Sequence, residues 1–336
     1  MRNILWLGAL SLSVALIGSE IESPRDVVVE IDGTRLTTAD LERKNPARLF
    51  QARNAFYEAK RKAVDEYVEE YLLERQAKKE GIPVAELLEK HVNSTIAKDP
   101  SEESLRVYYE GIDTPESFDA IKGKISDHLR QRRIAKARAA YVQSLKSASN
   151  IAIRVAPPRA GVSATNAPVR GSLDAPVTII EYADYECPYC QQIQPALDKL
   201  ETEYKGRIAF VYKDVPLPMH ANAQKASEAT HCAGVQGKYW ELHDLLAKSK
   251  RLDIASLKQG ARDLHLDGAA FDKCLDSGEK AEIVKGHLAE AQSLGLQGTP
   301  SFFINGRFFS GALSYEKLRE VVDEEIAEKL PQKASR

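Results

Sequence analysis

The sequence predicts an α/β domain in the C-terminal half of the chain, preceded by a mostly α-helical domain. Residues 177–180 are β-branched and almost wholly apolar, as in a buried strand, and residues 191–204 then carry apolar side chains at helical spacing. Residues 26–155 contain two long helical patterns. Between these regions, residues 156–172 contain three prolines and two glycines, which is typical of a semi-extended interdomain linker.

Length and composition indicate a soluble globular protein of more than one domain. The chain has 336 residues, of which 43% are hydrophobic and 29% charged. This length exceeds the usual single domain, and this composition is ordinary for a soluble globular protein. The formal net charge of -2 gives no reason to expect nucleic acid as a partner. We also expect no cofactor.

The first residues, 1–19, predict a signal peptide. Arg2 is followed by an uncharged apolar run over residues 4–17, and these fourteen residues are too few for a membrane span, which needs about 20. We therefore expect export to the periplasm or another extracytoplasmic compartment. Gly18 and Ser19 are small but form no Ala-x-Ala cleavage pattern, so an uncleaved N-terminal anchor is the alternative.

Residues 26–155 are expected to fold as one unit. It begins with a short strand at residues 27–31, a turn at Asp32-Gly33, and a helix start at Thr37, with Asp40 three residues later. Helices are then predicted at residues 48–79, 84–96, 101–109 and 116–147, and a closing strand at residues 151–155. The apolar positions of the first long helix include Phe56, Ala63, Tyr67, Tyr71 and Ala77.

A basic run lies within the last of these helices, at residues 128–138. We interpret it as a solvated helix face rather than as a patch for acidic clients or lipid. Acidic residues are plentiful elsewhere in the chain, and blocks of charge usually face water. We assign it no site.

The apolar strand leads into Cys187-Pro188-Tyr189-Cys190, a Cys-x-x-Cys placed where a strand gives way to a helix. At a helix N-terminus the unpaired N–H groups and the positive end of the dipole favour a thiolate, so the pKa of Cys187 should fall below the ~8.5 of a free cysteine. Pro188 suits the first helical turn, because its missing N–H is not needed there. Cys190, one turn on, would resolve the mixed disulfide that Cys187 forms.

Two other roles for this pair are weaker. A zinc site needs two more ligands, and the sequence holds no second Cys-x-x-Cys, so we expect no metal. A purely structural disulfide across two residues would constrain the unfolded chain only weakly. The scattered histidines of the C-terminal half are interpreted as packing or surface residues rather than as groups that tune the pair: His220, His231, His243, His265 and His287.

Two stretches of the chain together resemble the DsbA-like branch of the thioredoxin superfamily. They are Ala175-Pro176-Val177-Thr178-Ile179-Ile180-Glu181-Tyr182, which precedes the cysteines, and Gly298-Thr299-Pro300-Ser301-Phe302-Phe303-Ile304-Asn305-Gly306. The resemblance covers about residues 173–328. It implies thiol-disulfide oxidoreductase activity and an α/β thioredoxin fold with a helical insertion. Residues 221–294, which have helical periodicity and no convincing strand, would form that insertion.

The resemblance also implies supporting site residues. Pro300 would be the cis-proline that lies against the disulfide and exposes backbone groups to an extended substrate, with an ordinary trans-proline at a strand entrance as the alternative. Thr299 would tune the redox pair and product release. Glu181 would be a buried acid that accepts a proton when the thiols react, with a half-exposed strand residue as the alternative.

Two features depart from the most oxidising members of that family. DsbA itself has Pro-His between its cysteines, whereas this chain has Pro188-Tyr189 and lacks the imidazole that helps to stabilise the thiolate. Asp184 and Glu186 are negative charges close to the sulfurs in sequence, and would oppose thiolate formation. We therefore expect a reduction potential between ~-120 mV and the ~-270 mV of thioredoxin.

A second pair of cysteines, Cys232 and Cys274, lies 42 positions apart in the expected insertion. Exported chains rarely leave thiols free, and closing such a loop contributes ~3 to 4 kcal/mol in the chain-entropy model. We therefore expect a structural disulfide here. Two buried reduced cysteines are the alternative.

The predicted helical domain resembles the N-terminal chaperone module of SurA-like periplasmic peptidyl-prolyl isomerases in its order of strand, turn, helices and closing strand. No isomerase domain follows it, so prolyl isomerisation is not carried over. What the resemblance implies is a surface for unfolded polypeptide or for another copy of this chain.

The whole pattern predicts an exported thiol-disulfide oxidoreductase that forms or rearranges disulfides in secreted proteins. The alternatives are a disulfide isomerase or reductase that acts as an oligomer through the N-terminal domain, and a holdase chaperone with secondary redox activity. The expected partners are unfolded or cysteine-containing exported proteins and a membrane or soluble redox partner. The direction of catalysis and the clients do not follow from the sequence.

Overall fold

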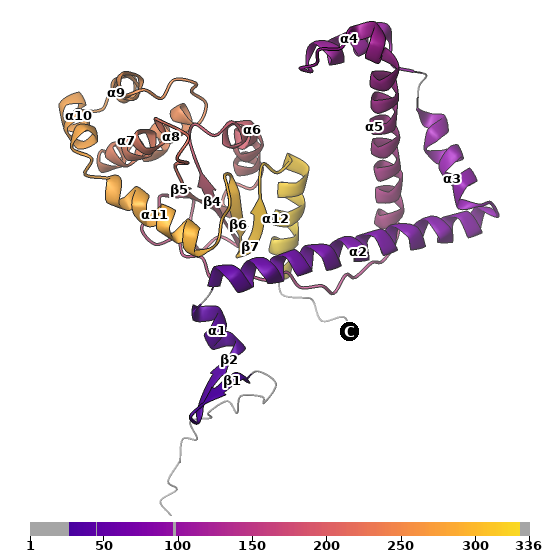
Figure 1. The fold of residues 1–336 in the computed structure, drawn as a ribbon, viewed down its shortest axis with the longest axis horizontal. Coiled ribbons are helices and arrows are strands. Elements are labelled where there is room, and N and C mark those ends of the chain that lie inside the picture. The colour runs from indigo at the N-terminus through magenta and orange to yellow at the C-terminus, as the bar shows by residue number, and fades with distance from the viewer. Residues whose placement is uncertain (1–26, 45, 97–98, 330–336) are drawn as a thin grey trace, which may run out of the picture. The chain divides into compact units, whose positions relative to one another are not determined.

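The structure, a computed structural model, describes residues 27–44, 46–96 and 99–329 (Figure 1). The predicted signal peptide lies outside the described residues. Among the helices that are described, none is long and apolar enough to cross a membrane. Contacts divide the described residues into two compact units. The larger holds residues 27–51, 164–301 and 310–329, and the smaller holds residues 52–163 and 302–309.

A five-stranded sheet with the order β3-β5-β4-β6-β7 forms the core of the C-terminal half. Its strands are β3 (Val169–Arg170), β4 (Val177–Ala183), β5 (Ile208–Asp214), β6 (Ser301–Ile304) and β7 (Arg307–Ser310). β4 and β5 run parallel, with Val177 opposite Ile208 and Ala183 opposite Asp214. Both strands are buried along nearly their whole length, as the apolar run predicted. The carboxyl ends of β4 and β5 therefore lie side by side at one edge of the sheet.

Helices flank this sheet in two groups (Figure 1). α6 (Pro188–Glu203) packs against α12 (Tyr315–Lys329). The predicted insertion forms the second group, which packs largely on itself and contains α7 (Ala223–Val235), α8 (Tyr239–Leu246), α9 (Ile254–Asp263), α10 (Gly268–Ser277) and α11 (Ala281–Ser293). Residues 221–294 contain no strand, as expected. The α/β fold with a helical insertion is thereby confirmed.

A disulfide between Cys232 and Cys274 joins α7 to α10 within the insertion. The Cα atoms of the two residues are 5.9 Å apart, and both residues are buried. The bond closes a loop of 42 positions in sequence. It therefore adds a covalent link between two helices that Lys225 also joins, by donating to the Leu275 carbonyl at 3.0 Å.

The predicted linker is held against this fold at two places. Its last residues form β3, which pairs antiparallel with β5. Further back, the backbone N–H of Ala160 donates to the carbonyl of Gly306 at 2.9 Å, in the turn between β6 and β7. Gly306 has φ +82°, and a Cβ there would lie 2.6 Å from the Ala160 carbonyl oxygen, so only glycine fits this contact.

The N-terminal hairpin consists of β1 (Val27–Ile31) and β2 (Thr34–Thr37), followed by α1 (Thr38–Lys44). Asp32 and Gly33 both have positive φ, as the predicted turn requires. The predicted helix start is also confirmed. Asp40 accepts a hydrogen bond from the backbone N–H of Thr37, and the Thr37 hydroxyl accepts one from the N–H of Asp40.

The helices of the N-terminal half are α2 (Pro46–Glu80), α3 (Val84–His91), α4 (Glu102–Glu110) and α5 (Phe118–Ser147), with a 3₁₀ turn at Asn93–Thr95. Two small apolar clusters hold them. One contains Leu73, Ala77, Leu87 and Val142, and the other Leu105, Phe118, Ile121 and Ile125. The first joins the C-terminal end of α2 to α3 and α5, and the second joins α4 to the start of α5.

Three details of the N-terminal half differ from expectation. The helix predicted at residues 84–96 ends at His91 and continues as the 3₁₀ turn. Residues 151–155 form no strand, because no neighbouring strand accepts their hydrogen bonds, and the hairpin strands pair with each other. Of the five apolar positions named on α2, only Ala77 is buried, because only the C-terminal end of this helix meets α3 and α5.

Removing the Cys232–Cys274 disulfide should destabilise the C-terminal half. We expect the double variant C232A/C274A to lose about 3 to 4 kcal/mol of unfolding free energy, because its unfolded chain regains the freedom of the open loop. Urea unfolding followed by the fluorescence of Trp240 measures this, since a chain that begins after residue 19 retains no other tryptophan. An unchanged unfolding midpoint would contradict a stabilising role for the disulfide.

Candidate functional site

The Cys-x-x-Cys pair lies at the carboxyl end of β4. A short turn follows this strand, in which the N–H of Cys187 donates to the carbonyl of Asp184 at 3.1 Å. Cys187 is then the N-cap of α6, and its carbonyl accepts the first helical hydrogen bond, from Gln191. Pro188 occupies the first helical position, as expected. Both cysteines are reduced and only 4% exposed.

The surroundings of Cys187 favour its thiolate. A hydrogen bond from Cys190 lowers the pKa of Cys187 from 9.0 to about 5, although burial alone would raise it. Thr299 and the backbone N–H groups of the first helical turn contribute further to the lower pKa. The fall in the pKa of Cys187 that the sequence predicted agrees with these surroundings.

Burial of Cys190 and Glu181 raises the pKa of both groups and so favours their protonated forms. Burial raises the pKa of Cys190 far above its ordinary value, and the hydrogen bond to Cys187 and the charge of Glu181 add to the rise. Glu181 is fully buried, and neither of its carboxylate oxygens has a hydrogen-bond partner among the described residues. Burial, with a smaller effect of Glu201, raises the pKa of Glu181 to about 8. The half-exposed alternative for this residue is wrong.

The loop before β6 faces Cys187. The Thr299-Pro300 peptide bond is cis, and the Sγ of Cys187 donates to the Thr299 carbonyl at 3.4 Å. The Pro300 carbonyl accepts the N–H of Gly311 at 2.8 Å, which fixes this loop to the segment after β7. Residues separated by 112 positions are thus brought into contact at the sulfur.

Asp184 and Glu186 act differently from expectation. Asp184 accepts the backbone N–H of Leu217 at 2.7 Å and contacts Nδ1 of His220 at 2.7 Å. Glu186 accepts the backbone N–H groups of Asn222 and Ala223 at the start of α7. Both carboxylates therefore bind the loop that leads into the insertion, and neither is among the leading influences on the pKa of Cys187.

Two large apolar side chains stand in solvent on the segments around the pair. Tyr189, between the cysteines, is 63% exposed, and Met219, in the loop that Asp184 holds, is 78% exposed. Single exposed apolar side chains are common on protein surfaces, so these two residues alone assign no partner.

Sequence reasoning missed one group of residues. Asp214, at the end of β5, lies against His231 and His287, which had been assigned to packing or surface. The chain separates these three residues by 17 and 73 positions, and no local motif links them. The position of Asp214 at the carboxyl end of a buried strand was the one signal that the sequence offered.

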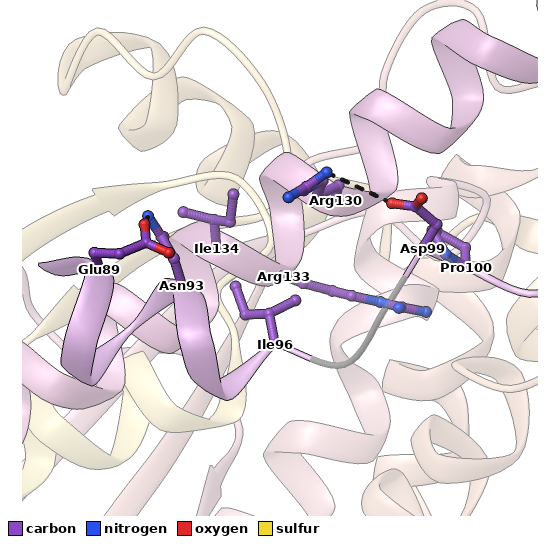
Figure 2. A pocket seen from close by; sticks show the side chains of 8 residues that line it. All are labelled: Glu89, Asn93, Ile96, Asp99, Pro100, Arg130, Arg133 and Ile134. Atoms are coloured by element: carbon purple, nitrogen blue, oxygen red, sulfur yellow. Dashed lines mark hydrogen bonds and ion pairs between the residues drawn. The ribbon is translucent and has the colours of Figure 1, made fainter.

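The predicted basic run partly lines a pocket in the smaller unit. Arg130, Arg133 and Ile134 of α5 meet Glu89, Asn93, Ile96, Asp99 and Pro100 around a volume of about 330 Å³ (Figure 2). Arg130 lies 3.6 Å from Asp99, so part of its charge is already matched. The mixed lining gives no reason to assign this pocket a ligand.

Comparison with known proteins shows what this half of the chain is similar to. Residues 163–324 match the Thioredoxin family. Two solved structures resemble about half of the chain. One is the thiol-disulfide exchange protein alpha-DsbA2 of Wolbachia pipientis, with 24% identity over 48% of this chain and 87% of that one, and a TM-score of 0.44. The other is a thioredoxin-like oxidoreductase of Silicibacter pomeroyi DSS-3, with 29% identity over 50% of this chain and 95% of that one, and a TM-score of 0.45.

One relative that matches this half of the chain is named as an antiporter rather than as an oxidoreductase. The Na(+)/H(+) antiporter NhaA 3 of Salinispora tropica is 40% identical over 156 residues, which is 46% of this chain but only 24% of that protein. The chain thus spans about a quarter of the length of this relative, and antiport is not carried over. The family match covers both cysteines and the Thr299-Pro300 loop that faces them, so residues 163–324 are similar to the thioredoxin family.

Proposed function

We propose that this protein is an exported thiol-disulfide oxidoreductase that donates disulfides to secreted proteins through Cys187 and Cys190. One observation carries the proposal. The sulfur of Cys187 sits at the N-terminus of α6, faces the Thr299 carbonyl at 3.4 Å, and has a pKa lowered to about 5. At neutral pH this cysteine is a thiolate, the form that attacks and leaves in disulfide exchange.

The reaction exchanges sulfur bonds without any cofactor. In the oxidised protein, a client thiolate attacks the Sγ of Cys187, the Cys187–Cys190 bond breaks, and Cys190 leaves with the electron pair and takes up a proton. A second client thiolate then attacks the client sulfur of the mixed disulfide. Cys187 leaves as a stable thiolate, the client gains one disulfide, and two electrons remain on the reduced pair.

Glu181 is proposed to exchange the proton that Cys190 needs. Its pKa of about 8 makes it a proton carrier near neutral pH, and its charge already influences Cys190. The cis Thr299-Pro300 loop would hold the extended client beside Cys187, through backbone groups. Tyr189 and Met219 offer apolar contacts to the same client.

The charge on Cys187 supports disulfide donation as the direction of catalysis. A low pKa stabilises the reduced pair relative to the disulfide, so the pair withdraws electrons from clients more strongly. Pro188-Tyr189 lacks an imidazole, but the thiolate has other support, from Cys190 and Thr299. We therefore place the potential nearer to ~-120 mV than to ~-270 mV.

The proposed setting is extracytoplasmic. The buried Cys232–Cys274 disulfide suits an oxidising compartment, as do the apolar residues expected to direct export. Unfolded or cysteine-containing exported proteins would be the clients. A membrane or soluble partner must reoxidise the pair after each turnover, because every disulfide donated leaves two thiols behind.

The equilibrium of the Cys187–Cys190 pair with glutathione tests this proposal. We expect a potential in the oxidising half of the range between ~-120 and ~-270 mV, because the Cys187 thiolate stabilises the reduced form. Alkylation and intact mass would count the free thiols, and two labels per reduced chain would show that Cys232–Cys274 stays closed. A chain that begins at residue 156 should give the same value.

Each alternative predicts a different result in this experiment. A value close to ~-270 mV would instead indicate a reductase. A clear change on removing residues 26–155 would indicate an oligomeric isomerase whose N-terminal region shapes the site. The Cys187→Ser variant is the control, and should form no Cys190 disulfide under any glutathione ratio. Absence of exchange in the unmodified chain would overturn the proposal.

Replacing Glu181 by Gln should alter both rate and stability. Attack of a client thiolate on the oxidised pair should slow by about 100-fold, because the Cys190 sulfur then leaves without its proton donor. The unmodified folded chain keeps Glu181 protonated from pH 4.5 to about 8, where the unfolded chain ionises it. Its stability should therefore fall over that window, by at most about 1.4 kcal/mol per pH unit, and Glu181→Gln should remove this fall.

Urea unfolding of the oxidised protein across this pH window measures the second effect. Glu282→Gln is the matched control, because the Glu282 side chain is 82% exposed. If Glu181→Gln and Glu282→Gln have the same pH dependence as the unmodified chain, Glu181 does not carry the proposed proton.

A holdase activity is the second candidate, and one observation favours it. Phe56, Tyr67 and Tyr71 of α2 are 70%, 67% and 53% exposed. Their spacing of 11 and 4 positions puts them within one stripe along this helix. An exposed aromatic stripe of this kind suits transient contact with unfolded polypeptide, or with a second copy of the chain.

Two variants separate the stripe from the redox pair. Replacing Phe56, Tyr67 and Tyr71 by Gln should abolish suppression of client aggregation without changing the glutathione equilibrium, because the helix loses its apolar surface but keeps its propensity. Cys187→Ser should do the reverse. Light scattering of a denatured cysteine-free client measures the first effect. Full suppression by the triple Gln variant would refute a holdase role for the stripe.

A further inference from the structure

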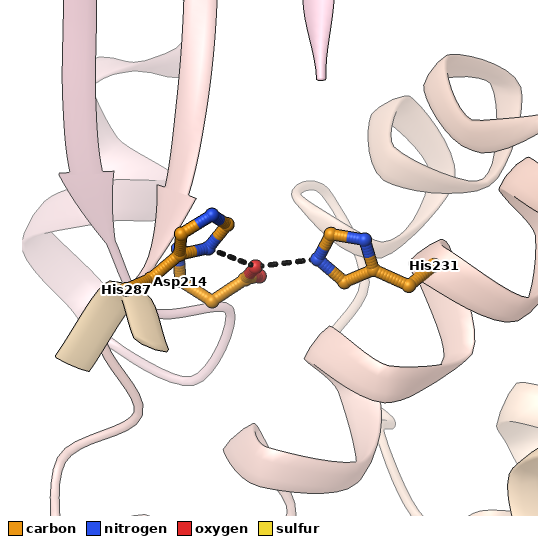
Figure 3. Close-up of side chains that lie close together, drawn as sticks. All are labelled: Asp214, His231 and His287. Carbon is orange, nitrogen blue, oxygen red and sulfur yellow. Dashed lines mark hydrogen bonds and ion pairs between the residues drawn. The ribbon is translucent and has the colours of Figure 1, made fainter. Parts of the chain in front are cut away.

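A buried cluster at the end of β5 lies outside the proposed thiol chemistry. Asp214 is fully buried, and His231 of α7 and His287 of α11 are 8% and 4% exposed (Figure 3). The Nε2 of His231 lies 2.7 Å from Oδ2 of Asp214, and the Nδ1 of His287 lies 3.0 Å from the same oxygen. Two imidazole rings thus converge on one carboxylate oxygen away from solvent.

The hydrogen bonds of His287 determine where its proton lies. Its Nε2 lies 3.2 Å from the carbonyl oxygen of Asn166. A carbonyl only accepts, so Nε2 must carry the proton and donate. In the neutral ring, Nδ1 then presents a lone pair, which accepts the backbone N–H of Asp214 at 3.2 Å. The same lone pair also faces Oδ2 of Asp214, another acceptor.

Two acceptors 3.0 Å apart repel each other unless a positive charge lies between them. The other oxygen, Oδ1 of Asp214, is buried and has no hydrogen-bond partner in the described part of the chain. The cluster therefore has an excess of acceptors.

These atoms have the composition of a metal site. Two imidazole nitrogens and a carboxylate are a common ligand set for zinc and its neighbours in the first transition row. A metal-bound histidine usually donates its other N–H to a carbonyl or carboxylate, which is the arrangement of His287 and Asn166. The three ligand atoms all lie within 4.8 Å of one another.

Little movement would be needed to admit an ion. Bonds of ~2.0–2.2 Å place neighbouring ligands about 3.0–3.5 Å apart in tetrahedral or octahedral geometry. The oxygen-to-nitrogen distances here are 2.7 and 3.0 Å, so the His231 ring must withdraw by less than about 1 Å. The unpartnered Oδ1 is available as a further ligand atom.

We propose that Asp214, His231 and His287 form a structural binding site for a divalent transition-metal ion of the zinc class. The ion would join α7 and α11 to the end of β5. It would take no part in thiol exchange. His231 adjoins Cys232, so the site and the Cys232–Cys274 disulfide would anchor α7 side by side.

Zinc binding by the full-length protein tests this inference. Tag-free protein is oxidised first, because the reduced Cys187–Cys190 pair would itself bind zinc. It is then stripped with EDTA, mixed with Zn²⁺, desalted and assayed for metal. We expect one zinc per chain, and a melting temperature that rises with zinc and falls again with EDTA, since an ion bound only by the folded state stabilises it.

Two variants locate the binding. His287→Gln should weaken zinc binding by at least ~10-fold and abolish the rise in melting temperature. His265→Asn is the matched control, because His265 is an exposed histidine of the same half of the chain, and should bind zinc normally. Co²⁺ in place of zinc should give a visible absorption band in the unmodified chain and in His265→Asn.

The inference fails if the oxidised, unmodified chain retains no zinc and its melting temperature does not respond to Zn²⁺. It also fails if His287→Gln retains zinc at full strength, since the ion would then lie elsewhere. The measurements on the unmodified chain stand even if His287→Gln does not fold, and none of them depends on redox activity.

Discussion

The parallel pairing of β4 and β5 is the constraint on which the rest of the C-terminal half depends. Its register sets Ala183 opposite Asp214, so both strands end at the same edge of the sheet. The turn after β4 carries Cys187, and the end of β5 carries Asp214. One ladder of backbone hydrogen bonds thereby fixes two groups of reactive side chains, and each is completed by residues from far along the chain.

Much of this architecture could be predicted because short stretches of neighbouring residues determine it. A β-branched apolar run gave β4, a proline after Cys187 marked the start of α6, and Asp32-Gly33 marked the hairpin turn. The redox pair needed only its spacing and its place between strand and helix. Thr299-Pro300 could be attached to it through family resemblance, although 112 positions separate Thr299 from Cys187.

The rest of the structure depends on contacts between elements that are far apart in the sequence, which local patterns do not reveal. Residues 151–155 alternate like a strand, but alternation provides no neighbour to pair with. The apolar positions of α2 were placed correctly on a helix, yet Phe56 and Tyr67 are exposed rather than buried. Asp214, His231 and His287 come from three elements, so the cluster exists only after the insertion has folded onto β5. The spacing of apolar residues predicts which face of a helix or strand is apolar. Which other element that face contacts depends on the tertiary fold.

The two carboxylates beside Cys187 have a consequence for anyone who wishes to tune this protein. By charge alone, Asp184 and Glu186 look like obvious targets for making the pair more oxidising. Each, however, accepts backbone N–H groups of the loop that enters α7, and that loop would be left with unpaired donors if the carboxylates were neutralised. A redesign would therefore loosen the entrance to the insertion before it altered the sulfur. Tyr189 is 63% exposed and lies between the two cysteines, so it can be replaced with less loss of packing when the potential is to be changed.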